Sequence, residues 1–294
     1  MISQFFVLFV VFVYGSLLGS FLNVCIYRIP KGSSIVFPPS SCPVCKTKIS
    51  WWQNIPIFSY LFLLGKCASC GSRISFRYPL IEGLSGILSV FLWERIIGNS
   101  SQIPDFHIFL LFFLEVVFVF LLIVITMIDF DYQIIPDELV YFGVAAGVIY
   151  SFFIHDLPFS LLAGLGASVF FYAVRVLGEF VFLKEAMGMG DVKFAAFLGV
   201  FLGIKKVILA VILSFPIGVA LALGLMALSL KSRKDYIPFG PAMAFAAFLS
   251  AYWGNQILHW YLHFAVRLLA GVFVHSFADL SQASVWFAHF AARA

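Results

Sequence analysis

Apolar residues occur in long runs along the chain, separated by short polar connections. Most of the runs are long enough to cross the roughly 30 Å hydrocarbon core of a bilayer, which takes about 20 helical residues. Because lipid gives the backbone no hydrogen-bond partners, such runs fold as helices. The pattern predicts an all-α polytopic membrane protein with about eight transmembrane helices. The runs cover about residues 4–26, 80–97, 107–128, 138–154, 159–182, 192–203, 207–230 and 237–254.

Composition supports this fold class. Of the 294 residues, 63% are hydrophobic and 11% are charged, and the mean hydropathy is +1.05. An average soluble domain has about 25% charged residues, so a soluble fold could not cover this much apolar surface. The net charge of +4 reflects basic residues beside the apolar runs and does not indicate a nucleic-acid partner. The first run has no basic segment before it and continues to about Tyr27, which favours a retained span over a cleaved signal peptide.

One long polar segment, residues 27–81, interrupts the apolar pattern. It contains no Asp or Glu, and by the positive-inside rule a segment this basic lies in the cytoplasm, with the N-terminus on the opposite side. Alternation along the chain then places 129–137 and 183–191 on the cytoplasmic side. The short run 192–203 and the pair Lys205-Lys206 fit the alternation poorly, so the topology near residue 204 stays open. The basic residues of the segment are Arg28, Lys31, Lys46, Lys48, Lys66, Arg73 and Arg77.

Four cysteines in the polar segment form two C-x-x-C pairs, Cys42/Cys45 and Cys67/Cys70. Each pair presents two thiolates from one tight turn, and two such turns complete the closed tetrahedral site of a structural zinc ion. Two disulfides or a redox pair are the alternative, which the reducing cytoplasm disfavours. We therefore predict a small cytoplasmic zinc-binding loop domain in which the ion supports folding. Cys25, within an apolar run, is interpreted as a packed thiol.

Two aspartates are the candidate chemistry of the membrane region. Acidic residues close to a membrane interior indicate function, because burying a carboxylate in lipid is costly. Asp129 ends one apolar run, and Asp191 closes the sequence Gly-Met-Gly-Asp just ahead of another. The predicted topology places both on the cytoplasmic side at similar depth. Two carboxylates that meet there can activate one water, which makes the pair the candidate catalytic centre of an aspartic protease.

Other acidic residues have simpler interpretations. Asp137 follows Pro136 at the head of a run and suits a helix N-cap. Asp131 suits an interfacial, solvated acid. Glu115 suits either a neutral, hydrogen-bonded position between helices, which we favour, or the lining of a polar cavity. Membrane carboxylates also act as ion ligands in transporters, so the residues by themselves leave a transporter with a cytoplasmic zinc module open beside the protease. A third interpretation is that the protein is a scaffold that only recruits its partner.

Several motifs together resemble the type IV prepilin peptidases, a GxGD-type family of membrane aspartic proteases. The order and spacing match over roughly residues 5–255, whereas the Gly-x-Gly-Asp motif alone would be weak support. The motifs are the segments 19–30, 74–82, 128–131, 135–137, 188–191 and 238–241, together with the two C-x-x-C pairs.

The resemblance implies a bifunctional enzyme of the bacterial inner membrane, in type IV pilus or type II secretion systems. Such an enzyme cleaves the basic leader from prepilins and pseudopilins at the cytoplasmic face, then methylates the new N-terminal amine with S-adenosylmethionine. The catalytic pair maps onto Asp129 and Asp191. A glycine that the family ties to methylation maps onto Gly65, and Glu82 matches a motif position, so both are candidate cofactor-binding residues. No Gly-x-Gly-x-x-Gly motif is present, and the cofactor rests on the resemblance alone.

The expected organisation has four parts. They are the first transmembrane helix (1–26), a zinc-binding, methyltransferase-associated domain (27–81), a membrane protease core (82–255) and a tail (256–294). The last 32 or so residues lie outside the resemblance, and we assign them no role.

Two regions are candidates for the groove that holds the substrate's apolar helix. They are the small-residue face of the first span, around Gly15 and Gly19, and the Pro238–Pro241 corner.

Overall fold

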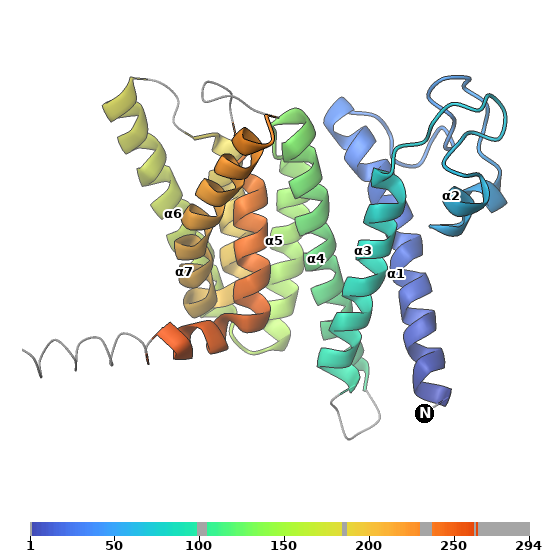
Figure 1. Ribbon diagram of the computed structural model, residues 1–294. Helices are drawn as coiled ribbons and strands as arrows, with labels where there is room; N and C mark the ends of the chain where they lie inside the picture. Colours follow the sequence, from blue (N-terminus) through green and yellow to red (C-terminus); the bar gives the residue numbers. More distant parts are fainter. Residues whose placement is uncertain (1, 99–104, 184–186, 230–236, 262, 264–294) are drawn as a thin grey trace, which may run out of the picture. The chain divides into compact units, whose positions relative to one another are not determined.

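Every regular element in the described residues is helical, apart from two isolated β-bridges (Figure 1). The computed structural model describes residues 2–98, 105–183, 187–229, 237–261 and 263. It divides into two compact units, Met1–Phe248 and Leu249–Ala294, and the first unit holds both candidate sites. The main helices are α1 (Ile2–Arg28), α2 (Phe58–Phe62), α3 (Arg77–Trp93), α4 (Phe106–Tyr132), α5 (Asp137–Phe153), α6 (Leu157–Phe182) and α7 (Met189–Ala227), and residues 240–261 are also helical.

Four of the described helices are long and apolar enough to cross a membrane. They are the span Gln4–Lys31 around α1, the whole of α4, Leu157–Val181 in α6, and α7. The protein is therefore an all-helical, multi-pass membrane protein, as the apolar runs predicted. The count of eight spans is not established, because α3 and α5 contain 17 residues each, short of the roughly 20 that a span requires.

The connection predicted near residue 204 is a break inside α7 and not a loop. Gly203 has φ 72° and ψ 174°, which is a non-helical conformation within an otherwise continuous helix. Glycine reaches positive φ without the steric penalty of a side chain. Gly203 therefore divides α7 into two arms that correspond to the predicted runs 192–203 and 207–230, and the first arm carries Asp191.

Small residues, glycine and serine, let α1 and α3 approach closely, as the small residues of the first span predicted. A Cβ on Gly15 would lie 2.4 Å from Ser89 Oγ, and one on Gly19 would lie 2.8 Å from Ser85 Cβ. On α3, a Cβ on Gly86 would lie 2.5 Å from an α1 serine hydroxyl. This face of α1 is therefore covered by α3, so it cannot be the predicted substrate groove.

Aromatic stacking fixes α4 against α5 and α7. The ring of Phe201 lies between those of Phe118 and Tyr150, with centroid distances of 4.1 and 4.5 Å. The hydroxyl of Tyr150 donates a hydrogen bond of 3.0 Å to Glu115 Oε1. The structure thereby confirms the predicted hydrogen-bonded position of Glu115 between helices.

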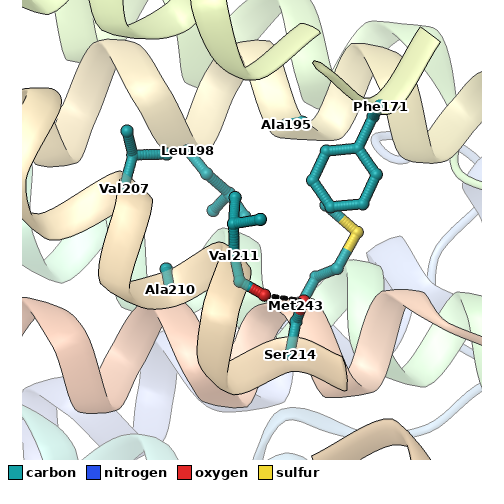
Figure 2. A pocket seen from close by; sticks show the side chains of 8 residues that line it. All are labelled: Phe171, Ala195, Leu198, Val207, Ala210, Val211, Ser214 and Met243. Carbon is teal, nitrogen blue, oxygen red and sulfur yellow. Dashed lines mark hydrogen bonds between the residues drawn. The ribbon is translucent and has the colours of Figure 1, made fainter. Parts of the chain in front are cut away.

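A small apolar cavity lies where α6, the two arms of α7 and the helix at 240–248 meet (Figure 2). Its one hydroxyl, that of Ser214, donates to the Val211 carbonyl at 2.7 Å, so no lining polar side chain is left to bind a ligand. The helix that carries Asp191 therefore borders an apolar cavity through Ala195 and Leu198. The lining residues are Phe171, Ala195, Leu198, Val207, Ala210, Val211, Ser214 and Met243.

Some of the predicted features lie outside the described residues. These are the polar connection 231–236 and, apart from residues 256–261 and 263, the tail 256–294. Residues 256–261 are helical.

Candidate active site

Asp129 lies in the last turn of α4, and its side chain is buried, with 4% of its surface exposed. The helix ends here because Gln133 adopts a left-handed conformation and donates its N–H to the Asp129 carbonyl at 3.0 Å. The side-chain oxygen Oδ2 of Asp129 accepts a hydrogen bond of 2.9 Å from the backbone N–H of Gly240. A Cβ on residue 240 would lie 2.6 Å from that oxygen, so glycine is the residue that fits.

Asp191 comes from a different helix than Asp129. It lies in the first turn of α7, after the cap residue Gly188, and 5% of its surface is exposed. Asp191 experiences the charge of Asp129 directly, which places the two carboxylates within electrostatic reach of each other. Gly190 packs against the segment ahead of α5, where a Cβ on it would lie 3.0 Å from Ile135 Cβ.

Lys193 ties the start of α7 to the start of α5. Its ammonium donates to both carboxylate oxygens of Asp137, at 2.8 and 2.6 Å. Asp137 is the first residue of α5, and Pro136 occupies the cap position without a side-chain hydrogen bond, so the predicted N-cap is wrong. A carboxylate in the first helical turn still interacts favourably with the helix dipole, and here it also pairs with a lysine from another helix.

Asp131 lies two residues beyond Asp129 but belongs to a separate ion pair. It accepts a hydrogen bond from Arg77 Nη1, and Arg77 Nη2 donates to the Met127 carbonyl at 3.4 Å. Of the Asp131 side chain, 37% is exposed, in agreement with the interfacial acid that the sequence predicted. Because Arg77 begins α3, this pair joins the end of the loop domain to the helix that carries Asp129.

Two of these contacts were missing from the predicted site. The family-like Pro238–Pro241 segment marked the region of Gly240, but only the fold brings its N–H to Asp129. Lys193 carries no comparable signal, because nothing in the sequence pairs it with Asp137. Only the fold therefore brings Gly240 to Asp129 and Lys193 to Asp137.

The four cysteines form a compact cluster in the segment between α1 and α3. All four Sγ atoms lie within 4.8 Å of one another, and the Cys42–Cys70 and Cys45–Cys67 separations are 3.9 and 4.0 Å. Tetrahedral coordination at a zinc–sulfur distance of about 2.3 Å places sulfurs about 3.8 Å apart. The cluster therefore fits a zinc ion, whereas disulfides are absent among these cysteines.

Local backbone geometry prepares the cysteines for metal binding. Each C-x-x-C turn is closed by a β-bridge, Ser41 with Lys48 in one and Lys66 with Arg73 in the other. Backbone N–H groups of the first turn point at the Cys42 sulfur and lower the pKa of that thiol to about 6. A thiolate is the form that binds zinc, so this turn favours the ligand state.

The two residues predicted to bind the methyl donor hold the segment around α2 in place. Glu82 is 8% exposed, and its Oε2 accepts a hydrogen bond of 2.8 Å from the backbone N–H of Ile57. Gly65 has φ 68° and donates its N–H to the Tyr60 carbonyl at 2.9 Å. A Cβ there would lie 2.9 Å from the Tyr60 hydroxyl. These contacts are structural, and binding of S-adenosylmethionine by either residue stays a prediction.

The fold and the site define a multi-pass helical membrane protein with two buried aspartates at the ends of different helices and a four-cysteine module. The sequence matches the family model for the bacterial peptidase A24 N-terminal domain over residues 13–96, which include the four cysteines. It matches the model for the type IV leader peptidase family over residues 116–223, which include both aspartates.

The chain also matches curated relatives, and each match covers nearly the whole length of the relative. The prepilin leader peptidase/N-methyltransferase of Pseudomonas aeruginosa is 34% identical over 85% of this chain and 92% of its own length. Those of Stutzerimonas stutzeri and Bacillus subtilis are each 33% identical, over 86% and 87% of this chain and 93% and 98% of their own lengths. The chain therefore belongs to the type IV leader peptidase family. No solved structure is significantly similar to it.

Proposed function

We propose that this protein removes the basic leader peptide from type IV prepilins and pseudopilins and then methylates the new N-terminal amine. Family membership and the names of the relatives support both activities. The observation that carries the peptidase is the pair Asp129 and Asp191, buried at the ends of two helices and within each other's electrostatic reach. Two carboxylates in such proximity avoid carrying two negative charges and so tend to share a proton.

The shared proton suits peptide hydrolysis. The ionised carboxylate of the pair takes a proton from a water, and the resulting hydroxide attacks the scissile carbonyl carbon. The protonated carboxyl donates to the carbonyl oxygen as negative charge develops there. The tetrahedral intermediate then collapses, and its leaving amine takes up a proton from the pair. The hydrogen bond from the Gly240 N–H orients the Asp129 carboxylate before the reaction, which limits the motion needed for attack.

The four cysteines would hold a structural zinc ion, because four protein ligands leave no open coordination position. S-adenosylmethionine supplies an electrophilic methyl group for the second reaction. The residues of this chain that we assign to that step are Gly65 and Glu82. Their contacts with the segment around α2 suggest that they shape the region where the methyl donor binds.

The organisation that follows has the first helix at 1–26, the loop domain at 27–81, the protease core at 82–255 and the tail at 256–294. We place the protein in a bacterial inner membrane, with its N-terminus in the periplasm and the aspartates at the cytoplasmic face. Eight transmembrane segments result if α3, α5, the two arms of α7 and the helix beginning at 240 each count as one. Its partners are then the bilayer and prepilin or pseudopilin precursors.

A single assay tests both activities. Purified protein in detergent is mixed with a prepilin, with or without S-adenosylmethionine, and the mass of the mature N-terminus is followed. We expect leader loss in both samples and one added methyl only when the donor is present. Asp129→Asn and Asp191→Asn should each abolish leader loss, whereas Asp131→Asn should retain it. Cleavage by either of the first two variants would refute the proposed catalytic pair.

A further inference from the structure

The loop domain carries an exposed apolar edge on and beside α2. The side chains of Phe58, Leu61 and Phe62 are spaced at i, i+3 and i+4, so they share one face of the helix. Their exposed fractions are 52%, 61% and 80%, and that of Leu64, just after the helix, is 83%. We call these four residues the apolar edge. Exposing four large apolar side chains to water costs free energy, so we expect a binding partner to cover this edge.

The opposite side of α2 faces the rest of the loop domain. The ring of Tyr60 packs edge-on against Phe76, with centroids 6.3 Å apart, and its backbone and hydroxyl lie against Gly65. These contacts fix which face of α2 is turned outward. The apolar edge is therefore a consequence of how α2 is held and not of a loosely placed segment.

The end of α1 indicates where the membrane boundary lies. Lys31 places its ammonium 3.4 Å from the centre of the Tyr27 ring, and Arg28 lies between them in the sequence. Aromatic and basic residues gather at the polar boundary of a membrane span. We therefore take the level of Tyr27 as the interface at this end of α1.

The anchor of α2 lies deeper than that boundary. Ile57, which precedes α2, donates its N–H to Glu82, and Glu82 lies level with Gly19 of α1, where a Cβ on the glycine would be 2.9 Å from Glu82 Cα. Gly19 lies eight residues before Tyr27, which corresponds to about 12 Å along a helix axis. Figure 1 shows α2 beside the upper half of α1 and α3 and below the irregular loops of the domain. With the boundary placed at Tyr27, α2 starts at the level of the apolar part of α1.

We propose that the apolar edge of α2 inserts into the lipid bilayer and that the basic residues of the loop domain bind anionic headgroups above it. Residues 27–81 contain seven basic and no acidic side chains, and apart from Arg77, which pairs with Asp131, these match the negative surface potential of a membrane containing anionic lipid. Trp51 and Trp52, in the turn before α2, are 81% and 47% exposed, and tryptophan favours the headgroup region. The contact with Glu82 sets the depth of this insertion, and the four-cysteine turns lie outside it.

Photocrosslinking of the full-length protein tests the proposal. Phe62→benzoylphenylalanine and Val44→benzoylphenylalanine are reconstituted separately in vesicles of phosphatidylethanolamine and phosphatidylglycerol, and the adducts are identified by mass spectrometry. Val44 is the matched control because it is also exposed, at 68%, but belongs to the first cysteine turn. Equal zinc content in the two variants shows that both loop domains are folded.

We expect severalfold more lipid adduct from position 62 than from position 44. Replacing phosphatidylglycerol with phosphatidylcholine should lower the yield at position 62, and an unchanged yield would refute the role of the basic residues. Equal lipid labelling at both positions would overturn the insertion itself. Adducts from position 62 that form only with a second copy of the chain, or only with added prepilin, would also overturn it. None of these outcomes depends on whether leader cleavage occurs.

Discussion

The contact between Gly240 and Asp129 makes a sharp prediction for Gly240→Ala. The new Cβ would lie 2.6 Å from Asp129 Oδ2 and 3.2 Å from its Cγ, whereas Cβ atoms essentially never approach a heavy atom within 3.0 Å. The carboxylate must therefore move by at least about 0.4 Å, because the close-packed surroundings leave the backbone little room to give way. The movement also weakens the 2.9 Å hydrogen bond from the Gly240 N–H.

The magnitude follows from both effects. A hydrogen bond to a charged group contributes about 1.5–3 kcal/mol, and misplacing a catalytic group by about 1 Å can lower the rate about 100-fold. We therefore expect Gly240→Ala to reduce kcat for leader cleavage roughly 10- to 100-fold. The Michaelis constant should change little, because the altered contact is with Asp129 and not with the distant parts of the substrate. The assay is steady-state cleavage of a purified prepilin.

Gly224→Ala is the matched control. A Cβ on Gly224, also in a helix, would meet no heavy atom within 4 Å, so this variant should cleave normally and gain up to about 1 kcal/mol of helix stability. Zinc content and detergent-solubilised yield should be the same in both variants. Full cleavage activity in Gly240→Ala would refute the reasoning, and so would an equal loss in Gly224→Ala.

Three further predictions follow from contacts around the site. The Asp137–Lys193 pair is partly exposed, so a double-mutant cycle with Asp137→Asn and Lys193→Met should give a coupling energy in unfolding of about 0.2–1 kcal/mol; additive effects would show that the pair does not join α5 to α7. Gly199→Val places its Cβ 2.5 Å from a backbone carbonyl of α6, so it should destabilise the protein by about 1–3 kcal/mol in thermal unfolding. Gly166→Val is the control, because a Cβ there meets no heavy atom within 4 Å. Equal melting temperatures of the two variants would contradict the close helix crossing. Zinc affinity should fall as the pH is lowered and fall more steeply below about 6, where Cys42 also takes up a proton; metal retention measured by elemental analysis between pH 8 and pH 5, flat across that range, would contradict the thiolate cluster.

The candidate site was partly predictable because acidic residues are rare next to long apolar runs. Asp129 and Asp191 are acids beside apolar runs, and a shared membrane face follows from counting spans. Their surroundings were not predictable in this way. Gly240 and Lys193 are ordinary residues in their own segments, and their contacts with Asp129 and Asp137 join positions far apart in the chain. A hydrogen bond of this kind depends on the relative placement of whole helices.

The amino-acid sequence by itself determined the helical membrane character of the chain, the grouping of four cysteines for one metal ion, and the two acids that mark the site. Each depends on local quantities: the apolar content of about 20 successive residues, the spacing of thiols within a turn, or a charge next to an apolar run. The tertiary structure alone decided that α3 covers the small-residue face of α1, that α7 bends at Gly203 without a loop, and that Glu82 binds the backbone N–H of Ile57 just before α2. These features arise from packing between helices. Each contact depends on the positions of two helices at once, so the sequence pattern of neither helix predicts it.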